Sequence, residues 1–448
     1  MGWWLLACTL RPGGHPVAEE YRLRVQLTVV LGMSLLLGAC ATSPASETTT
    51  SATLAVEAST LPEPQSSSST VPEQSEFPRF EPGECVGDDL EELARTGRYT
   101  LECGYVIVLE DRDDETGPTV SLPVTVARTP NPTPEPDPVI YLAGGGGHAH
   151  LNYARYFIEA VGDAILVDRD FIQYNQRGAP DTRPELSCPG YTGFLFDLAA
   201  DPVVGSLWTE EHVNYLAACE ATLTESGVDL TQYNSATNAS DARDVRIALG
   251  YDEANYYGTS YGTRLGLDLI RDYPEGVRSI ILDSVYPPEV GYYSEYATTM
   301  HRAFAAVFEG CAKDSSCSAR YPDLESDFYA TVDRLNAEPQ LVDSPFGPVS
   351  ADGGVFMDAM AIYLYSPEWI PRAPQAMDTV AHGDLRPLRD VVVGAVTAPD
   401  INWTMFYAMQ CREELPFEDF GQAVALGESL PAQITEHYTD GFTRFHFE

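Results

Sequence analysis

The pattern of apolar and polar positions predicts alternating strands and helices from about residue 105 to residue 283. Short apolar runs bounded by turn-forming residues are typical of buried strands, and they occur as YVIVLED (105–111), TVSLPVTVAR (119–128), VIYLA (139–143), FIQYN (171–175), ANYYG (254–258) and VRSIILD (277–283). Helical spacing appears at 151–162, 209–225, 237–249 and 263–273. This alternation favours an α/β fold with a mostly parallel sheet flanked by helices.

The pattern changes after Pro287 and Pro288. Amphipathic helices are predicted at 292–310, 323–337, 353–365 and 375–396, with prolines between them. We expect no strand between residue 290 and Glu448, because no run of strand type is found there. We interpret this part as a helical cap region in which the last strands of the core are missing.

The N-terminal segment is typical of an export signal. Arg22 and Arg24 precede an apolar run, 25–39, that has the length of a signal-peptide core and is too short for a membrane span. The run ends in LGAC, which resembles the lipobox of bacterial lipoproteins and would place the lipid on Cys40. An ordinary signal peptide that happens to end near a cysteine is the alternative. The expected location is the outer face of the bacterial cell membrane, with the lipid as the only membrane contact.

A segment rich in Ser, Thr, Pro and Glu follows and is expected to be a disordered tether, since it cannot bury enough apolar area to fold. The stretch before Val17 fits no part of a signal peptide, so we expect the true start codon downstream of Met1. The expected organisation is a signal peptide (1–40), a linker (41–82), an α/β core (83–288) and a helical cap region (289–448).

Charge argues against nucleic acid as a partner. The chain has 26 basic and 67 acidic side chains, a formal net charge of −41, and would repel a phosphate backbone. The acidity keeps the surface solvated. It could alternatively adapt the protein to salt or attract cationic substrates such as peptide N-termini.

Cysteine usage agrees with export. Of nine cysteines, Cys8 and Cys40 belong to the leader, and the other seven are expected to pair in an oxidising compartment. Proximity in sequence suggests the pairs Cys85–Cys103, Cys188–Cys219 and Cys311–Cys317. Cys411 is left over, which indicates a reactive thiol, an intermolecular bond or a missing partner.

The motif G-T-S-Y-G at 258–262 is the strongest candidate for chemistry. It follows a predicted strand and precedes a predicted helix, which is the context of a nucleophile elbow. Ser260 would then project above the sheet near a helix N-terminus, where negative charge is stabilised. The alternative is an ordinary surface turn.

The glycine run at 144–147 directly follows the strand VIYLA. An oxyanion hole needs a backbone N–H that approaches the substrate without a side chain in the way. We expect the N–H of Gly145, or of Gly146, to act with that of Tyr261. A flexible strand-exit loop is the alternative, whereas a phosphate-binding loop fits poorly because no Lys-Ser/Thr pair follows.

Together these segments resemble the proline iminopeptidase and tripeptidyl aminopeptidase branch of the α/β-hydrolases. The resemblance spans roughly residues 83–420 and is carried by AGGGGH (143–148), YNQRGAPDTRPELSCP (174–189), NASDARDVRIALGYDEANYYGTSYGTRLGL (238–267) and YPEGVRSIILDSVYPP (273–288). It implies an α/β-hydrolase fold with a helical cap, and exopeptidase activity. The glycine loop lacks the His and Pro of the family motif, and Asn175 replaces its usual Asp.

The partners of a catalytic serine are not found. The fold orders them as Ser, then Asp or Glu, then His, but none of the histidines after Ser260 follows a predicted strand in a suitable loop; they are His301, His382, His437 and His446. Asp283 ends a strand and is more simply a structural residue. The resemblance also implies a later cysteine as the partner of Cys411. We therefore expect the sequence to be incomplete at its C-terminus.

The sequence thus predicts a serine hydrolase that cleaves an amide or ester through Ser260, with a peptide or small ester as substrate. An esterase or lipase of the same fold and a catalytically inactive binding lipoprotein are the alternatives. No cofactor is expected, and no motif with metal-ligand spacing occurs.

Overall fold

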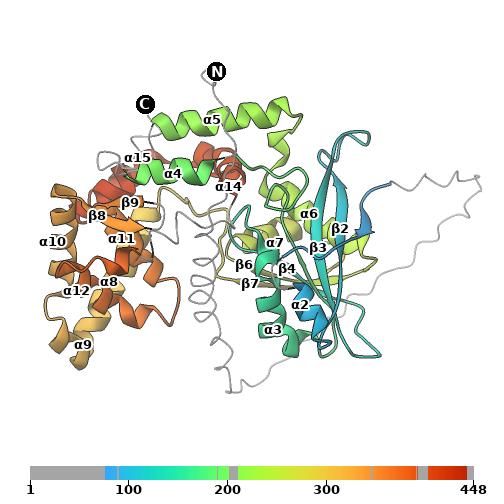
Figure 1. Ribbon diagram of the computed structural model, residues 1–448, viewed down its shortest axis with the longest axis horizontal. Helices are drawn as coiled ribbons and strands as arrows, with labels where there is room; N and C mark the ends of the chain where they lie inside the picture. The colour runs from blue at the N-terminus through green and yellow to red at the C-terminus, as the bar shows by residue number, and fades with distance from the viewer. Residues whose placement is uncertain are drawn as a thin grey trace, which may run out of the picture.

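The structure is a computed structural model (Figure 1). It describes residues 76–440, except 88–89, 189, 201–209, 345–346, 390 and 392–401. The predicted signal peptide with Cys40, most of the predicted linker, and His446 lie outside the described residues. No helix within the described residues is long and apolar enough to cross a membrane.

Seven strands form one mixed sheet in the order β1-β2-β3-β5-β4-β6-β7. Neighbours are antiparallel from β1 to β5 and parallel from β5 to β7. The strands span Arg79–Pro82 (β1), Thr100–Leu109 (β2), Thr119–Arg128 (β3), Val139–Leu142 (β4), Phe171–Tyr174 (β5), Ala254–Thr259 (β6) and Val277–Asp283 (β7). All six runs predicted as strands are therefore confirmed, and the sheet begins slightly before the expected start of the core.

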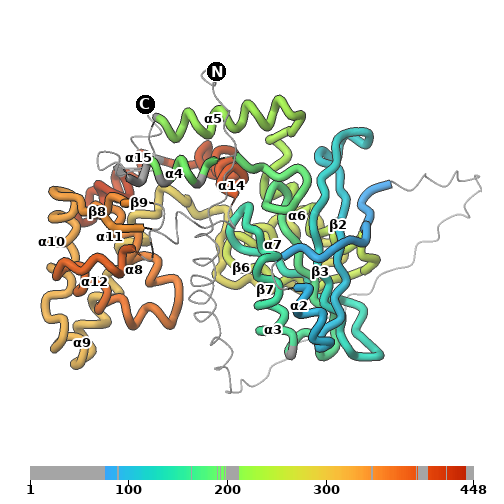
Figure 2. Tube along the Cα trace, in the orientation of Figure 1, coloured from blue at the N-terminus to red at the C-terminus, as the bar shows by residue number. Residues whose placement is uncertain are grey.

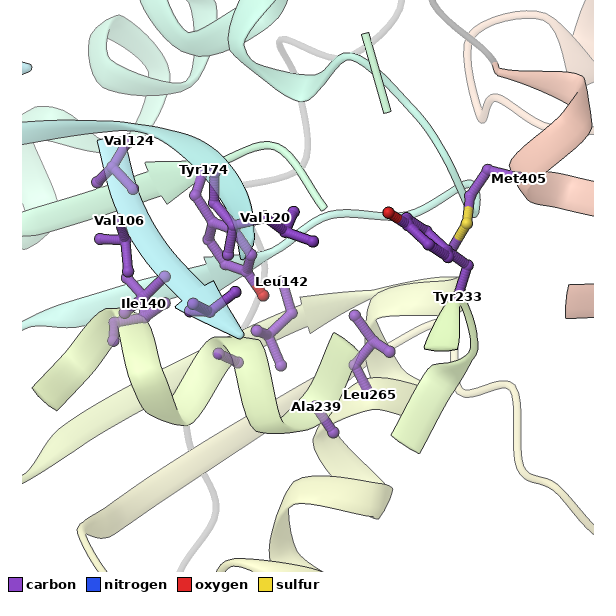
Figure 3. Close-up of a cluster of buried hydrophobic side chains, with 14 of the residues drawn as sticks. Val106, Val120, Val124, Ile140, Leu142, Tyr174, Tyr233, Ala239, Leu265 and Met405 are labelled. Atoms are coloured by element: carbon purple, nitrogen blue, oxygen red, sulfur yellow. The ribbon is translucent and has the colours of Figure 1, made fainter. Parts of the chain in front are cut away.

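Helices cover both faces of the sheet (Figure 1). Helices α6 (Ser235–Ala248) and α7 (Tyr261–Asp272) share a core with Ile140 and Leu142 of β4, whereas α2 (Leu90–Arg95) and α3 (Ala154–Ile165) share one with Tyr141. Alternate residues of a strand point to opposite faces, so the two cores lie on opposite sides of the sheet. Figure 3 shows Ile140, Leu142 and Leu265 within the first of these cores.

A second, mainly helical lobe has its own core, built around Phe304, Phe328 and Phe356. Figures 1 and 2 show it on the left, away from the sheet. Its principal elements are α8 (Tyr296–Lys313), α9 (Ser315–Arg320), α10 (Leu324–Ala337), α11 (Gly353–Tyr363), α12 (Ala373–Ala381) and α16 (Ala432–Thr435). The helices predicted after residue 290 are confirmed in outline, although α12 ends at Ala381 and part of the predicted helix 375–396 lies outside the described residues.

The expectation of no strand after residue 290 is wrong. Strands β8 (Gln340–Ser344) and β9 (Gly347–Ala351) form an antiparallel hairpin in the second lobe. Its two inward valines, Val342 and Val349, are directly paired and buried. The hairpin is inconspicuous in sequence because neither QLVDS nor GPVSA is a continuous apolar run, and β9 contains a proline, a residue usually depleted in strands.

Further helices are α4 (Tyr191–Ala200), α5 (Glu210–Glu225), α14 (Trp403–Met409) and α15 (Phe420–Gly427). Helix α15 packs against α8 of the second lobe. Helix α14 belongs to the region predicted as cap. Its Met405 and Met409 are nevertheless buried in the main core of the sheet. The chain therefore returns from the helical lobe and packs against the α/β core.

The three disulfides predicted from the sequence are confirmed, as Cys85–Cys103, Cys188–Cys219 and Cys311–Cys317. Cys411 has no disulfide partner among the described residues. Each bond links segments that are close in sequence, so each closes a short loop within one lobe.

Candidate active site

Ser260 lies on a strained turn between β6 and α7. Its backbone has φ 54° and ψ −121°, a conformation that residues with a side chain rarely adopt and that is concentrated at functional sites. The residue is exposed at the carboxyl end of a parallel strand. This is the geometry of a nucleophile elbow.

The two glycines of the motif are required by close backbone approaches. A Cβ at Gly258 would lie 2.5 Å from the carbonyl oxygen of Gly262, and one at Gly262 would lie 1.9 Å from the carbonyl oxygen of Leu142. Both distances are far below any normal contact, so no larger residue fits without a backbone shift. The sequence G-T-S-Y-G therefore matches the local shape of the chain at both ends of the turn.

The glycine loop after β4 lies directly against the serine. A Cβ at Gly144 would lie 3.1 Å from the Cβ of Ser260 and 3.0 Å from the carbonyl oxygen of Thr259. Gly145 is exposed and has φ 64°, whereas Gly146 and Gly147 are buried. Sequence reasoning placed these two segments in one site, and the fold brings them together.

Two backbone amides at this junction have the features of an oxyanion hole. Among the described residues the N–H of Gly145 donates no backbone hydrogen bond. Tyr261 is the first residue of α7, and amides in the first turn of a helix have no intrahelical acceptor. The sequence left either Gly145 or Gly146 as the donor from this loop. Gly145 is exposed, whereas Gly146 is buried against Met409.

Side chains from the turn after β5 hold the start and the exit of the glycine loop. The amide of Gln176 donates to the carbonyl oxygen of Ala143 at 2.9 Å. The buried Asn175 accepts from the N–H of Leu151 at 2.9 Å and donates to the carbonyl oxygen of Pro180 at 2.9 Å. An amide both donates and accepts here, which a carboxylate in the same place could not do. Asn175 therefore has a structural role beside the site.

The side chain of Thr263 fixes the nucleophile turn through hydrogen bonds, and sequence reasoning did not identify it. Its hydroxyl donates to the carbonyl oxygen of Ser260 at 2.6 Å and accepts from the N–H of Tyr286 at 2.8 Å. The side chain is fully buried. Thr263 thus joins the nucleophile turn to the segment that follows β7.

Asp283 lies at the end of β7, next to the nucleophile strand. Its carbonyl oxygen accepts from the N–H of Ser260 at 2.9 Å, and its carboxylate accepts from Tyr257 and from Ser284 at 3.0 and 3.1 Å. Ser284 also has a positive φ, of 59°. These bonds give Asp283 the structural role at a strand end that the sequence favoured.

The described histidines after Ser260 have no hydrogen bond or ion pair to that serine among the contacts found in the structure. His382 is exposed and bonds Asp378 of its own helix, and His437 pairs with Asp358 at 3.1 Å in the second lobe. His301 lies on α8 of the same lobe. None of the hydrogen bonds and ion pairs found for these three reaches Ser260, so we assign no general base among them.

A carboxylate cluster lies beside the first turns of α7. Glu413 accepts from the N–H and hydroxyl of Ser235, whose hydroxyl also contacts that of Tyr261 at 2.9 Å. Arg264 pairs with both Glu413 and Glu414. Burial raises the pKa of Glu414 above its ordinary value, and Arg264 opposes that shift. Two carboxylates therefore share one guanidinium beside the first turns of α7.

A buried ion pair connects two of the segments that carried the family resemblance. Arg177 forms a two-pronged contact with Asp241 of α6, at 2.6 and 2.8 Å, and both side chains are fully buried. Arg112 also bonds Asp241, at 2.5 Å. Burial would raise the pKa of Asp241, but the two guanidiniums outweigh it and hold that pKa below its ordinary value. The arginine of the Q-R-G segment therefore acts structurally, behind the site.

Comparisons with known proteins agree with the fold. The family model described as alpha/beta hydrolase fold matches residues 137–309. The chain is 28% identical over 317 residues to a tripeptidyl aminopeptidase of Streptomyces lividans, covering 68% of this chain and 57% of that protein. It is 25% identical over 280 residues to the serine protease Hip1 of Mycobacterium tuberculosis, covering 59% of this chain and 53% of that protein.

Among solved structures, a proline iminopeptidase of Mycobacterium smegmatis matches at 18% identity with a TM-score of 0.30, covering 61% of this chain and 70% of that chain. The chain has the α/β-hydrolase fold. Its sequence relatives include a tripeptidyl aminopeptidase and a serine protease, which agrees with the resemblance that the sequence motifs carried. The chain spans little more than half the length of these curated relatives.

Proposed function

We propose that this protein is a serine hydrolase that acts by acyl transfer through Ser260. The observation that carries the proposal is the exposed serine on a strained strand-to-helix turn, with the glycine loop packed against it. The hydroxyl oxygen would attack the substrate carbonyl carbon while a base takes its proton. The amides of Gly145 and Tyr261 would stabilise the oxyanion. Collapse would release the amine or alcohol, which takes the proton, and water would then hydrolyse the acyl-enzyme.

We further propose that the base and its orienting acid are supplied from outside the described residues. A serine hydroxyl is a weak nucleophile without an adjacent base. His382 and His437 are engaged with Asp378 and Asp358, and no contact found for His301 on α8 reaches Ser260. This part of the proposal is supported by the order of the triad in the fold, in which the acid and base follow the nucleophile in sequence.

The substrate we favour is a peptide with a free amino terminus, cleaved outside the membrane. The relatives named above are peptidases, and one of them is a tripeptidyl aminopeptidase. The formal net charge of −41 also favours a cationic amino terminus over a neutral ester. Attachment to the membrane through a lipid on Cys40 belongs to the same proposal, and a Cys40→Ala variant should move from the membrane fraction to the soluble fraction.

The test compares three chromogenic substrates: a tripeptide anilide with a free amino terminus, its N-acetylated form and a p-nitrophenyl ester. The proposal predicts hydrolysis of the free tripeptide, at least roughly tenfold slower cleavage of the acetylated form, and no activity in Ser260→Ala. Cleavage of the ester alone would indicate an esterase. No cleavage of any substrate by the native protein would favour a binding lipoprotein.

A further inference from the structure

Helix α14 begins beside the glycine loop, although more than 250 residues separate the two in sequence. Asn402 is the N-cap of the helix, and its backbone N–H donates to the carbonyl oxygen of Gly147 at 2.9 Å. Asn402 is buried, with 7% of its surface exposed. The backbone of α14 is therefore joined directly to the loop that follows β4.

The side chain of Asn402 adds two bonds. Its Nδ2 donates to the carbonyl oxygen of Gly178 at 3.0 Å, and its Oδ1 accepts from the N–H of Met405 at 3.1 Å. Gly178 lies in the turn after β5, whose Gln176 holds Ala143 at the other end of the glycine loop. A single residue thus ties the glycine loop, the turn after β5 and the start of α14 together.

The methionines of α14 close the far side of the loop. A Cβ at Gly146 would lie 1.8 Å from the methyl carbon of Met409, and one at Gly147 would lie 2.9 Å from the Cβ of Met405. Both methionines are buried in the main core, and Figure 3 shows Met405 next to Tyr233 at the edge of the cluster. The loop is therefore held between α14 on one side and the nucleophile turn on the other.

We propose that Asn402 is a positioning residue for the oxyanion hole, acting through the glycine loop. It touches neither substrate nor Ser260, and its role rests on the proposed function in requiring catalysis at that serine. The amide of Gly145 stabilises an oxyanion only when it is fixed before the reaction, and small displacements of such a group are costly. Helix α14 thereby sets the geometry of a site made by the α/β core.

The test uses the full chain with Asn402→Asp, which removes the donor to Gly178 and keeps the acceptor that caps α14. Asn402→Ser removes the same donor without adding charge. The matched control is Asn131→Asp, which removes a side-chain donation to the carbonyl oxygen of Val167 in an exposed loop. We expect faster amide hydrogen exchange in the peptide covering residues 143–149 in both Asn402 variants and unchanged exchange there in the control.

In the tripeptide assay, both Asn402 variants should lose roughly tenfold or more in kcat with KM within about twofold of the native value. Unchanged exchange in residues 143–149 would show that the hydrogen bonds of Asn402 do not order the glycine loop, which would overturn the proposal. Faster exchange with unchanged kcat would overturn its catalytic role. A native protein that cleaves no substrate would contradict the proposed function instead, and the exchange comparison would still decide whether Asn402 orders the loop.

Discussion

At the scale of single residues, the candidate site depends on buried polar groups that fix backbone positions. Thr263 is one example, because its hydroxyl bonds both the nucleophile turn and the segment after β7. Thr263→Val keeps the shape but leaves the N–H of Tyr286 without its acceptor. We expect a loss of about 1–3 kcal/mol in the free energy of unfolding and slower phosphonylation of Ser260. Thr263→Ser should restore both, and equal labelling rates for Val and Ser variants would contradict this role.

The ion pair between Arg177 and Asp241 leads to a second prediction at this scale. Arg177→Met leaves the carboxylate of Asp241 buried with only the partial compensation of Arg112. Breaking a buried pair in this way typically costs about 3–5 kcal/mol. Chemical denaturation should show that loss. A comparable variant of the exposed pair Lys313–Glu309, Lys313→Met, should change stability by less than about 1 kcal/mol.

At the scale of elements, β7 has no neighbour on its outer side within the described sheet. Ile281 on this strand is 60% exposed, and an unpaired strand edge with apolar side chains promotes association. In the chain of residues 1–448, Ile281→Lys should therefore reduce self-association, measured by analytical ultracentrifugation. The control Val167→Lys changes a residue that is 65% exposed and lies outside the strands. Equal effects of the two substitutions would show that exposure alone, and not the edge, is responsible.

The elements also show what a sequence can and cannot predict. Six of the seven strands were found because each is a short apolar run between turn residues, whereas β1 has the sequence RFEP and lacks such a run. The elbow was found because its glycines have fixed spacing. Thr263 and Asn402 were missed because their roles depend on contacts across the fold, which no local pattern records. The hairpin of β8 and β9 was missed because its pairing in the second lobe buries only a few alternating residues.

At the scale of the whole molecule, the two lobes should respond oppositely to pH. The pKa of Asp241 is lowered in the folded sheet lobe. Its contribution to the free energy of unfolding is therefore present above the unfolded pKa and is lost as pH falls through the folded pKa. Burial would lower the pKa of His437, but Asp358 outweighs it and raises that pKa. The contribution of His437 is therefore full below its unfolded pKa, near 6.5, and is lost as pH rises.

Denaturation followed by hydrogen exchange in each lobe would check this. Between about pH 6 and pH 8, peptides of α11 and α16 should lose protection relative to those of the sheet, because the unfolded histidine pKa is about 6.5. His437→Gln should remove that difference. If the second lobe of the native protein became better protected from hydrogen exchange as pH rises, the stabilising role of the His437–Asp358 pair would be contradicted.

The central claim is that Ser260 is the nucleophile, and labelling of the native full-length protein with a fluorophosphonate probe tests it most directly. The account predicts a single modified peptide that contains Ser260, and no labelling of Ser260→Ala. A native protein that cleaves peptides while the probe leaves Ser260 unmodified, or modifies a different residue, would contradict it.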